Sequence, residues 1–203
     1  MTLDDVLPLL RARLMPIGSV PLSPTFSDYD LSGERPVAPL LKAAAVLVPL
    51  VMRGDGLQVI LTRRSHHLPT HAGQIAFPGG RCEDSDADVG ATALREAYEE
   101  IGLDPAYVTL VGVSDAYETV TGFAVTPVVA IVDPAATFTP DPREVDEIFE
   151  VPLAFLMDTA NHEPHAREYN GVARRFYAMP YGNYYVWGAT AGIVRALYLR
   201  VFG

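Results

Sequence analysis

The chain has 203 residues, of which 49% are hydrophobic and 20% charged, so it can bury a sizeable core and its length suits one elaborated domain. Its formal net charge of −10 argues against a nucleic-acid partner, because binding to DNA or RNA backbones depends on clustered lysines and arginines. A small anionic ligand is still compatible with this composition, since every basic residue except Lys42 is an arginine, whose planar fork suits phosphate groups.

The cysteine content and the N-terminus bear on the cellular compartment. Cys82 is the single cysteine, which excludes an intramolecular disulfide and fits a reducing compartment. The first residues lack the basic start and the apolar run of a signal peptide, and no stretch approaches the ~20 apolar residues that span a bilayer. We therefore expect a cytoplasmic protein with no membrane partner.

The N-terminal part is expected to stand apart from the main domain. Apolar residues at helical spacing predict an amphipathic helix over residues 3–15, and the Pro, Ser and Gly content of residues 16–39 predicts an extended arm. We divide the chain into this N-terminal helix and arm, residues 1–39, and one domain over residues 40–203. The arm and the aromatic residues near the C-terminus favour a homodimer.

Strand-like and helical patterns alternate along the rest of the chain. Residues 43–52 and 56–64 flank an RGDG turn and predict a β-hairpin. Further strands are predicted within residues 73–80, 107–113, 123–132 and 174–188, and helices within 90–101, 151–157 and 189–202. The order lacks the regular spacing of a doubly wound sheet. It predicts an α/β protein of the α+β kind, with a mixed β-sheet flanked by helices.

The helix over residues 90–101 concentrates negative charge. In the stretch REAYEEIGL, Glu96, Glu99 and Glu100 are three or four residues apart or adjacent, so they occupy adjoining positions on one helical face. Like charges at this spacing destabilise an isolated helix by a few tenths of a kcal/mol per pair. Two interpretations follow: a solvated acidic face with Arg95 as a partial partner, or a cradle for a metal ion.

The sequence before this helix favours the metal interpretation. FPGGRCEDSDAD places Gly79 and Gly80 after a buried-looking strand, where glycine lets the backbone approach a ligand closely. Clustered carboxylates suit Mg²⁺ or Mn²⁺, and Mg²⁺ commonly bridges to substrate phosphates. Arg63 and Arg64 end a strand near these glycines, so at least one is a candidate phosphate ligand.

These residues resemble the Nudix box, the loop-helix-loop signature of hydrolases that cleave nucleoside diphosphates linked to another group. The segment over residues 95–103 matches every specified position of the box's C-terminal half. In the N-terminal half, the loop between Gly80 and Arg95 is one residue longer than the pattern, which leaves the role of Asp86 open. The resemblance implies a Nudix fold, a mixed β-sheet sandwiched between helices.

A second resemblance concerns the substrate. LTRRSHHLPTHAGQIAFPGG, residues 61–80, is similar to the extra motif that precedes the Nudix box in coenzyme A pyrophosphatases. Pro69 stands where that motif has its second arginine, so Arg63 or His71 would have to compensate. Residues 182–198 also resemble this subfamily. The resemblance implies hydrolysis of the diphosphate bond of coenzyme A to 3′,5′-ADP and 4′-phosphopantetheine, with coenzyme A or a related nucleotide as the small-molecule partner.

The resemblance also implies roles for the site residues. Glu96 and Glu100 are expected to ligate Mg²⁺ or Mn²⁺, with Glu99 as a further or water-mediated ligand and the Gly80 carbonyl as a backbone ligand. Arg95 is expected to orient a glutamate. A divalent metal lowers the pKa of a bound water and produces a nucleophile at neutral pH, so no covalent intermediate is needed.

The general base is not fixed by the sequence. Residues 141–153 resemble the stretch in which many Nudix proteins carry a glutamate that faces the metals, so Glu144 is the first candidate and Glu147 the second. Glu99 is a third. The alternative is that this acidic segment is a solvated or capping loop. A general base must come within about 3 Å of the attacking water, and the spacing of residues in the sequence does not define that distance.

Substrate contacts are expected from the loop and glycine segments. The candidates are Arg63, Arg64, Ser65, His71 and Gly79. Aromatic side chains that offer a face for stacking an adenine, or that simply pack in the core, are Tyr117, Phe123, Tyr181, Tyr184, Tyr185 and Trp187.

Two other functions stay open. One is a Nudix hydrolase acting on a different nucleoside diphosphate derivative, such as ADP-ribose or NADH. The other is a nucleotide-binding Nudix protein without turnover, against which the intact set Glu96, Glu99 and Glu100 argues.

Overall fold

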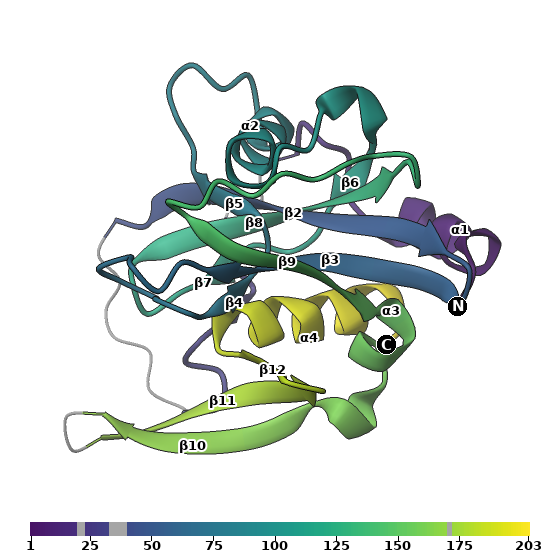
Figure 1. Cartoon of the computed structure of the whole chain (residues 1–203). Helices are drawn as coiled ribbons and strands as arrows, with labels where there is room; N and C mark the ends of the chain where they lie inside the picture. Colours follow the sequence, from purple (N-terminus) through teal and green to yellow (C-terminus); the bar gives the residue numbers. More distant parts are fainter. Residues whose placement is uncertain (20–22, 33–39, 170–171) are drawn as a thin grey trace.

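The computed structural model of the chain describes residues 1–19, 23–32, 40–169 and 172–203 (Figure 1). Its helices are α1 (Leu3–Arg13), α2 (Val89–Ile101), α3 (Leu153–Leu156) and α4 (Ala189–Val201), with short 3-10 turns η1 (Pro105–Tyr107) and η2 (Thr159–Asn161). Its strands are β1 (Phe26–Ser27), β2 (Lys42–Arg53), β3 (Gly56–Arg64), β4 (Ile75–Ala76), β5 (Gly79–Arg81), β6 (Val108–Val113), β7 (Tyr117–Glu118), β8 (Phe123–Val132), β9 (Val145–Pro152), β10 (Glu163–Tyr169), β11 (Val172–Tyr181) and β12 (Tyr184–Trp187). No helix among these residues is both long and apolar enough to cross a bilayer.

The main sheet is mixed and is built around β2. This strand pairs antiparallel with β3 and β5 and parallel with β8. Beyond β3 lie β4 and β9, both antiparallel to it, while β6 and β7 are antiparallel to β8 and the short β1 is parallel to β7. The predicted mixed sheet between helices is confirmed, because α2 covers one face and α4 the other (Figure 1).

The two faces of β2 explain why its sequence is apolar almost throughout. Ala45 and Leu47 pack into the cluster that contains the apolar side of α2. Val48 and Leu50 pack into the cluster that contains α4. A strand covered on both faces has no solvent side, so it reads as a continuous hydrophobic run instead of an alternating one.

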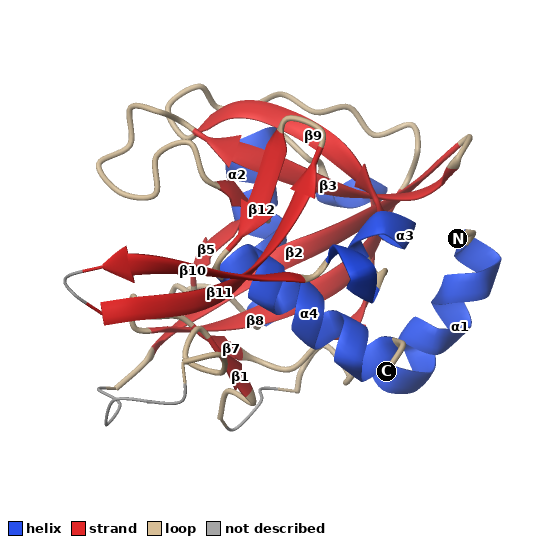
Figure 2. Cartoon of the chain, turned by 90° about the horizontal axis from the view of Figure 1, so that it is seen from below, coloured by secondary structure: helices blue, strands red, loops and turns tan. Residues whose placement is uncertain are grey.

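A second, three-stranded antiparallel sheet is formed by β10, β11 and β12. Its inner face presents Met179 and Val186, both fully buried, to the core that α4 shares. Figures 1 and 2 show α4 beside β11, and in Figure 1 α4 lies between this small sheet and the main sheet. β12 contacts β4, which pairs with the end of β3. The small sheet therefore brings the C-terminal aromatic residues near the end of β3.

The sequence patterns missed β9 and β10, and also the two-residue strands β1 and β7. Residues 141–153 were expected to form an acidic loop and residues 151–157 a short helix, but residues 145–152 form β9, in which buried Val145, Phe149 and Val151 alternate with more exposed positions. β10 was also not predicted, and residues 73–80 form two short strands instead of one. β9 pairs with β3, a long-range partner that compensates for acidic residues with low strand propensity.

The described part of the N-terminal arm packs on its own chain. β1 pairs with β7, and the Asp28 carboxylate accepts hydrogen bonds from the Tyr117 hydroxyl (2.9 Å) and the Val120 amide (2.8 Å). α1 contributes Val6 and Leu10 to the core shared with α4. Residues 20–22 and 33–39 of the arm lie outside the described residues. The division at residue 39 and the homodimer stay predictions.

Candidate active site

The candidate site lies where β5 meets the second half of α2. The helix begins after Asp88, whose carboxylate accepts a hydrogen bond from the Ala91 amide (2.9 Å), and it ends at Gly102, which adopts a left-handed conformation with φ of 64°. These caps place the predicted glutamates on the turns of α2 that face β5.

The glycine pair of β5 lets the backbone touch the glutamates. A Cβ atom on Gly80 would lie 2.5 Å from Oε1 of Glu96. Gly79 has φ of 155°, and a Cβ atom there would lie 2.5 Å from the carbonyl oxygen of Ala45. The Gly79 amide donates a hydrogen bond to Oε2 of Glu100 (3.1 Å). Position 79 therefore requires glycine, a side chain at Gly80 would displace the Glu96 carboxylate, and both residues border the carboxylate cluster.

Arg95 is the cation at the centre of this cluster. Its Nη1 lies 2.9 Å from Oε1 of Glu96 and 3.3 Å from Oε2 of Glu99. Its Nη2 also donates to the carbonyl oxygen of Arg81 (3.1 Å). The structure thus places Arg95 where it holds two of the three glutamates, which is the geometry that its predicted orienting role requires.

Asp86, whose role the sequence left open, anchors Arg95 from the other side. Its two carboxylate oxygens accept hydrogen bonds from Nε (3.0 Å) and Nη2 (2.9 Å) of Arg95. The Thr92 hydroxyl and the Glu83 amide donate to the same carboxylate, at 2.8 and 2.9 Å. The Arg95 guanidinium is the main cause that holds the pKa of Asp86 well below its usual range. The extra residue in the loop between Gly80 and Arg95 therefore leaves Asp86 paired with Arg95.

Glu100 is the most deeply placed of the glutamates. It is 3% exposed, and its Oε1 lies 3.5 Å from Nη1 of Arg64. Burial raises the pKa of Glu100 from its ordinary value of 4.5 to about 7, while the Gly79 amide and Arg64 oppose the shift and the charges of Glu96 and Glu144 add to it. Burial also raises the pKa of Glu96, and the nearby charges of Glu99 and Glu144 contribute. Four carboxylates thus share one electrostatic environment.

This donor set fits a hard divalent cation. The Glu96 carboxylate lies beside Gly80, the Glu100 carboxylate accepts from the Gly79 amide, and Glu99 shares Arg95 with Glu96. The raised pKa values of Glu96 and Glu100 express desolvation and repulsion that a cation would relieve. Among the described residues, no three His, Cys, Asp or Glu side chains already form a group that could hold a metal ion. Arg95 contacts one oxygen of Glu96 and one of Glu99, and Arg64 contacts one oxygen of Glu100. Metal binding would need the glutamate side chains to draw together, while Arg95 keeps its contact with one oxygen of Glu96.

The structure separates the two first candidates for the general base. Glu144 is exposed on the loop before β9, and its charge acts on both Glu96 and Glu100. Glu147 instead forms an ion pair with Arg63 (3.0 Å) and accepts a hydrogen bond from the Tyr184 hydroxyl (2.8 Å). Only Glu144 is brought to the glutamate cluster, whereas Glu147 belongs to a neighbouring group.

The predicted substrate contacts differ in their accessibility. Ser65 is fully buried, its amide donates to the carbonyl oxygen of Glu144 (2.8 Å) and its hydroxyl accepts from the His67 amide (3.4 Å), so it ties two loops together. His71 is exposed, with φ of 57°, and its Nδ1 lies 2.9 Å from Oε1 of Gln74. Their contacts with a substrate stay predictions. Thr92 and Tyr184, which hold Asp86 and Glu147, gave no distinguishing sequence signal because their partners come from other segments.

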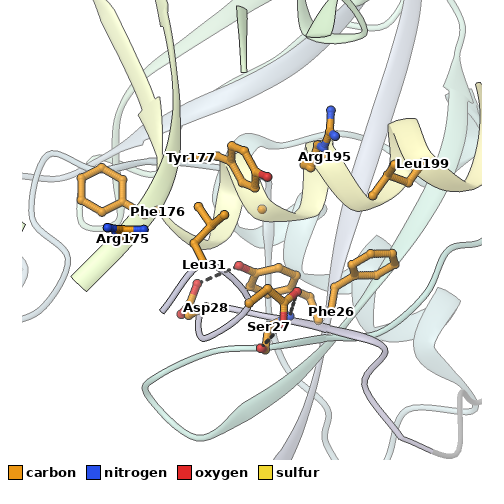
Figure 3. Close-up of a pocket in the computed structure, with 12 residues that line it drawn as sticks. Phe26, Ser27, Asp28, Leu31, Arg175, Phe176, Tyr177, Arg195 and Leu199 are labelled. Carbon is orange, nitrogen blue, oxygen red and sulfur yellow. Dashed lines mark hydrogen bonds between the residues drawn. The ribbon is translucent and has the colours of Figure 1, made fainter. Parts of the chain in front are cut away.

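A separate cavity of about 230 Å³ lies between the described part of the arm, β11 and α4 (Figure 3). Its lining includes Phe26, Leu31 and Tyr177, together with Asp28 and Tyr117, which are hydrogen-bonded to each other. Apart from Tyr117, one of the aromatic candidates for stacking an adenine, none of the residues expected at the active site lines it. It therefore forms no part of the carboxylate cluster.

A mixed sheet between two helices, with a glycine pair facing helical glutamates, defines the class of this protein. The chain matches the family model of the NUDIX domain over residues 41–175, and it belongs to the Nudix family of hydrolases. Members of this family generally use divalent metals and bind small nucleotide substrates.

Two relatives are Nudix hydrolases named NudL, both described as uncharacterized. The one from Escherichia coli O139:H28 (strain E24377A / ETEC) is 45% identical over 182 residues, which covers 86% of this chain and 94% of that protein. The one from Shigella boydii serotype 18 (strain CDC 3083-94 / BS512) is 45% identical over 161 residues, covering 79% and 83%.

Solved Nudix structures are more distant. RenU from M. smegmatis is 24% identical with a TM-score of 0.47, covering 56% of this chain and 71% of that chain. The NUDIX domain of NrtR from Shewanella oneidensis, solved with ADP ribose, is 21% identical with a TM-score of 0.43, covering 63% and 82%. The family assignment depends on the family model and the NudL relatives, not on these structures.

The burial of Glu100 makes a prediction about stability. Because its pKa is higher in the folded than in the unfolded protein, its ionisation disfavours folding, and the metal-free protein should lose stability as pH rises from 4.5 through about 7. Glu100→Gln removes this ionisation. In EDTA at pH 8 the variant should be the more stable by up to about 3 kcal/mol, since one pKa unit corresponds to about 1.4 kcal/mol. Thermal unfolding should show a difference in Tm that narrows at pH 5.

The matched control for this comparison is Glu99→Gln. The Glu99 side chain is 55% exposed, so removal of its charge should leave Tm nearly unchanged at both pH values. A Glu100→Gln variant that is less stable than the wild type in EDTA at pH 8 would contradict the account.

The anchoring of Arg95 makes a prediction about activity. Asp86→Asn keeps the size of the side chain but loses the carboxylate that accepts two hydrogen bonds from Arg95. Arg95 should then hold Glu96 less firmly, and kcat for diphosphate hydrolysis should fall at least tenfold, about 1.4 kcal/mol of barrier. Asp115→Asn breaks the comparable pair with Arg200 elsewhere in the fold and should leave kcat unchanged. Equal kcat in the two variants would refute the anchoring role.

Proposed function

We propose that this Nudix hydrolase cleaves the diphosphate bond of coenzyme A, and of derivatives that share it, to 3′,5′-ADP and 4′-phosphopantetheine. One observation carries the proposal: Arg64, within the segment that resembles the coenzyme A pyrophosphatase motif, lies 3.5 Å from Glu100 in the Nudix helix. The motif and the glutamates thus meet at one site. The Arg64 side chain is 25% exposed, and a guanidinium carries five N–H donors, so it can contact a phosphate oxygen while it stays beside Glu100.

The roles of the chain's own residues follow from their contacts. Glu96, Glu100 and the Gly80 carbonyl would hold Mg²⁺ or Mn²⁺, with Glu99 as a further ligand and Arg95 orienting Glu96. When bound, a divalent metal neutralises the diphosphate and lowers the pKa of a bound water. Glu144, which is exposed and whose charge acts on both Glu96 and Glu100, would accept the proton of the attacking water.

The alternatives differ in the substrate or in turnover. ADP-ribose and NADH carry the same diphosphate, so the carboxylate cluster alone does not discriminate among these nucleotides. Pro69, exposed in the loop after Ser65, replaces the second arginine of the coenzyme A pyrophosphatase motif. This departure is the reason for testing ADP-ribose and NADH as alternative substrates. A binding protein without turnover would have no use for the complete arrangement in which Arg95 orients Glu96 and Glu99.

The direct test is to incubate the purified protein with coenzyme A and Mg²⁺ or Mn²⁺ and to separate the products by chromatography. We expect 3′,5′-ADP and 4′-phosphopantetheine, and in a competition among coenzyme A, ADP-ribose and NADH we expect coenzyme A to have the highest kcat/KM. Glu100→Gln should abolish turnover because it removes a negatively charged metal ligand.

The matched control is Glu163→Gln, which removes a carboxylate from β10 and should retain full activity. If Glu100→Gln keeps activity within about tenfold of the wild type, about 1.4 kcal/mol, Glu100 does not hold the metal. If no divalent metal supports product formation while nucleotide binds tightly, the enzyme proposal fails. A higher kcat/KM for ADP-ribose or NADH would replace coenzyme A as the substrate.

A further inference from the structure

Two consecutive arginines at the end of β3 point to opposite faces of the main sheet. Arg64 lies on the α2 face, where it pairs with Glu100. Arg63 is opposite Glu147 on β9, and the two side chains form an ion pair on the other face. The pairing register shifts between these two arginines, so Arg64 is opposite Val145. One strand end therefore offers two guanidinium groups to different parts of a bound molecule.

Arg63 is held by two neighbouring side chains, Tyr184 and Glu147. Its guanidinium lies 5.4 Å from the centre of the Tyr184 ring, and its Nη2 lies 3.0 Å from Oε2 of Glu147. The Tyr184 hydroxyl donates to Oε1 of the same glutamate (2.8 Å), and this contact is the main reason why the pKa of Tyr184 is raised. The Tyr184 ring stacks on Phe149 with centroids 3.7 Å apart and planes within 1°. Tyr184 thus links Arg63, Glu147 and Phe149.

This arrangement contributes more to binding than to stability. The Arg63 and Glu147 side chains are 31% and 38% exposed, and ion pairs at such positions contribute little to stability. Holding a long arginine side chain in one orientation costs conformational entropy before any ligand arrives. Because the Arg63 side chain has already lost this entropy in the unbound protein, it loses less conformational entropy when it binds an anion. Within the described part of the chain, Nε and Nη1 of Arg63 have no hydrogen-bond partner.

We propose that Tyr184 is a positioning residue for substrate binding, which, together with Glu147, holds Arg63 as a fork for a phosphomonoester outside the diphosphate being cleaved. The geometry separates the two phosphate positions, because Arg64 is on the face of the glutamates and Arg63 is on the opposite face. Tyr184 does not stack an adenine itself, because its ring is engaged by Phe149 and Arg63. The inference rests on the proposed function, in which coenzyme A supplies such a group as its 3′-phosphate.

The test measures equilibrium affinity, so it does not depend on turnover. Titration calorimetry in Mg²⁺ buffer compares 3′,5′-ADP with 5′-AMP, which differ only in the 3′-phosphate. Wild-type protein should bind 3′,5′-ADP at least tenfold more tightly. Arg63→Gln and Tyr184→Leu should bring the two affinities within about threefold, which corresponds to less than about 0.7 kcal/mol of discrimination. Tyr184→Phe, which keeps the ring contacts but loses the hydroxyl bond to Glu147, should lie between.

The matched control is Tyr181→Leu. Tyr181 is opposite Tyr184 on β11, but its ring packs against Phe155 instead of Arg63, so this variant should keep the wild-type ratio of affinities. The kinetic counterpart is hydrolysis of coenzyme A and of dephospho-coenzyme A: Tyr184→Leu should raise KM for coenzyme A, leave KM for dephospho-coenzyme A unchanged and change kcat for neither.

The outcomes separate this inference from the proposed function. A wild-type protein that binds the two nucleotides equally, or that binds neither, overturns the role of Arg63 even if it hydrolyses coenzyme A. The role of Arg63 is also overturned if folded Arg63→Gln or Tyr184→Leu protein retains the tenfold ratio of affinities. If Tyr184→Leu fails to fold, Arg63→Gln is the decisive variant, because the Arg63 side chain is only partly buried. Loss of the ratio in these variants supports the inference, and does so even if coenzyme A is not cleaved.

Discussion

The backbone of β5 approaches α2 so closely that a side chain at Gly80 would displace Glu96, and the geometry of the site depends on this contact. Gly80 lies against the carboxylate of Glu96, and the Gly79 amide reaches Glu100. β2 sets the distance between β5 and α2, because it pairs with β5 and buries Ala45 and Leu47 against α2. Core packing therefore fixes where the carboxylates stand relative to the backbone, before any ligand binds.

That contact creates an electrostatic cost, which the surrounding residues offset only in part. Burying a carboxylate disfavours its charged form unless hydrogen bonds and opposite charges compensate. Arg95 compensates Glu96 and Glu99, and Asp86 in turn fixes Arg95, whereas Glu100 has one amide and a more distant Arg64. The least compensated group is the most buried one. A site arranged in this way favours a cation, and its metal-free form stores the unfavourable energy.

The sequence predicted the parts of this arrangement that are local. Glu96 and Glu100 are one helical turn apart, and Gly102 ends the same helix, so spacing alone placed them on α2. The sheet class followed from the order of strands and helices. β9 was not predicted, because Asp146, Glu147 and Glu150 weaken its strand pattern and its pairing with β3 is visible only in three dimensions. The contact of Glu147 with Tyr184 spans 37 residues, which no spacing rule covers.

The register of β9 against β3 shows how a missed strand changes the reading of the site. A shift of one residue in strand pairing exchanges the faces on which side chains lie. With the register observed, Glu147 joins Arg63 and Tyr184, and Glu144 is left in the loop beside Glu96 and Glu100. Glu144 and Glu147, the first and second candidates for the general base in the sequence, thereby acquire different surroundings. Arg63 and Arg64 lie on different faces because successive side chains of a strand alternate, and the register of β9 places Glu147 beside Arg63. The end of β3 therefore separates the group that would meet the reacting diphosphate from the group that would meet a second phosphate.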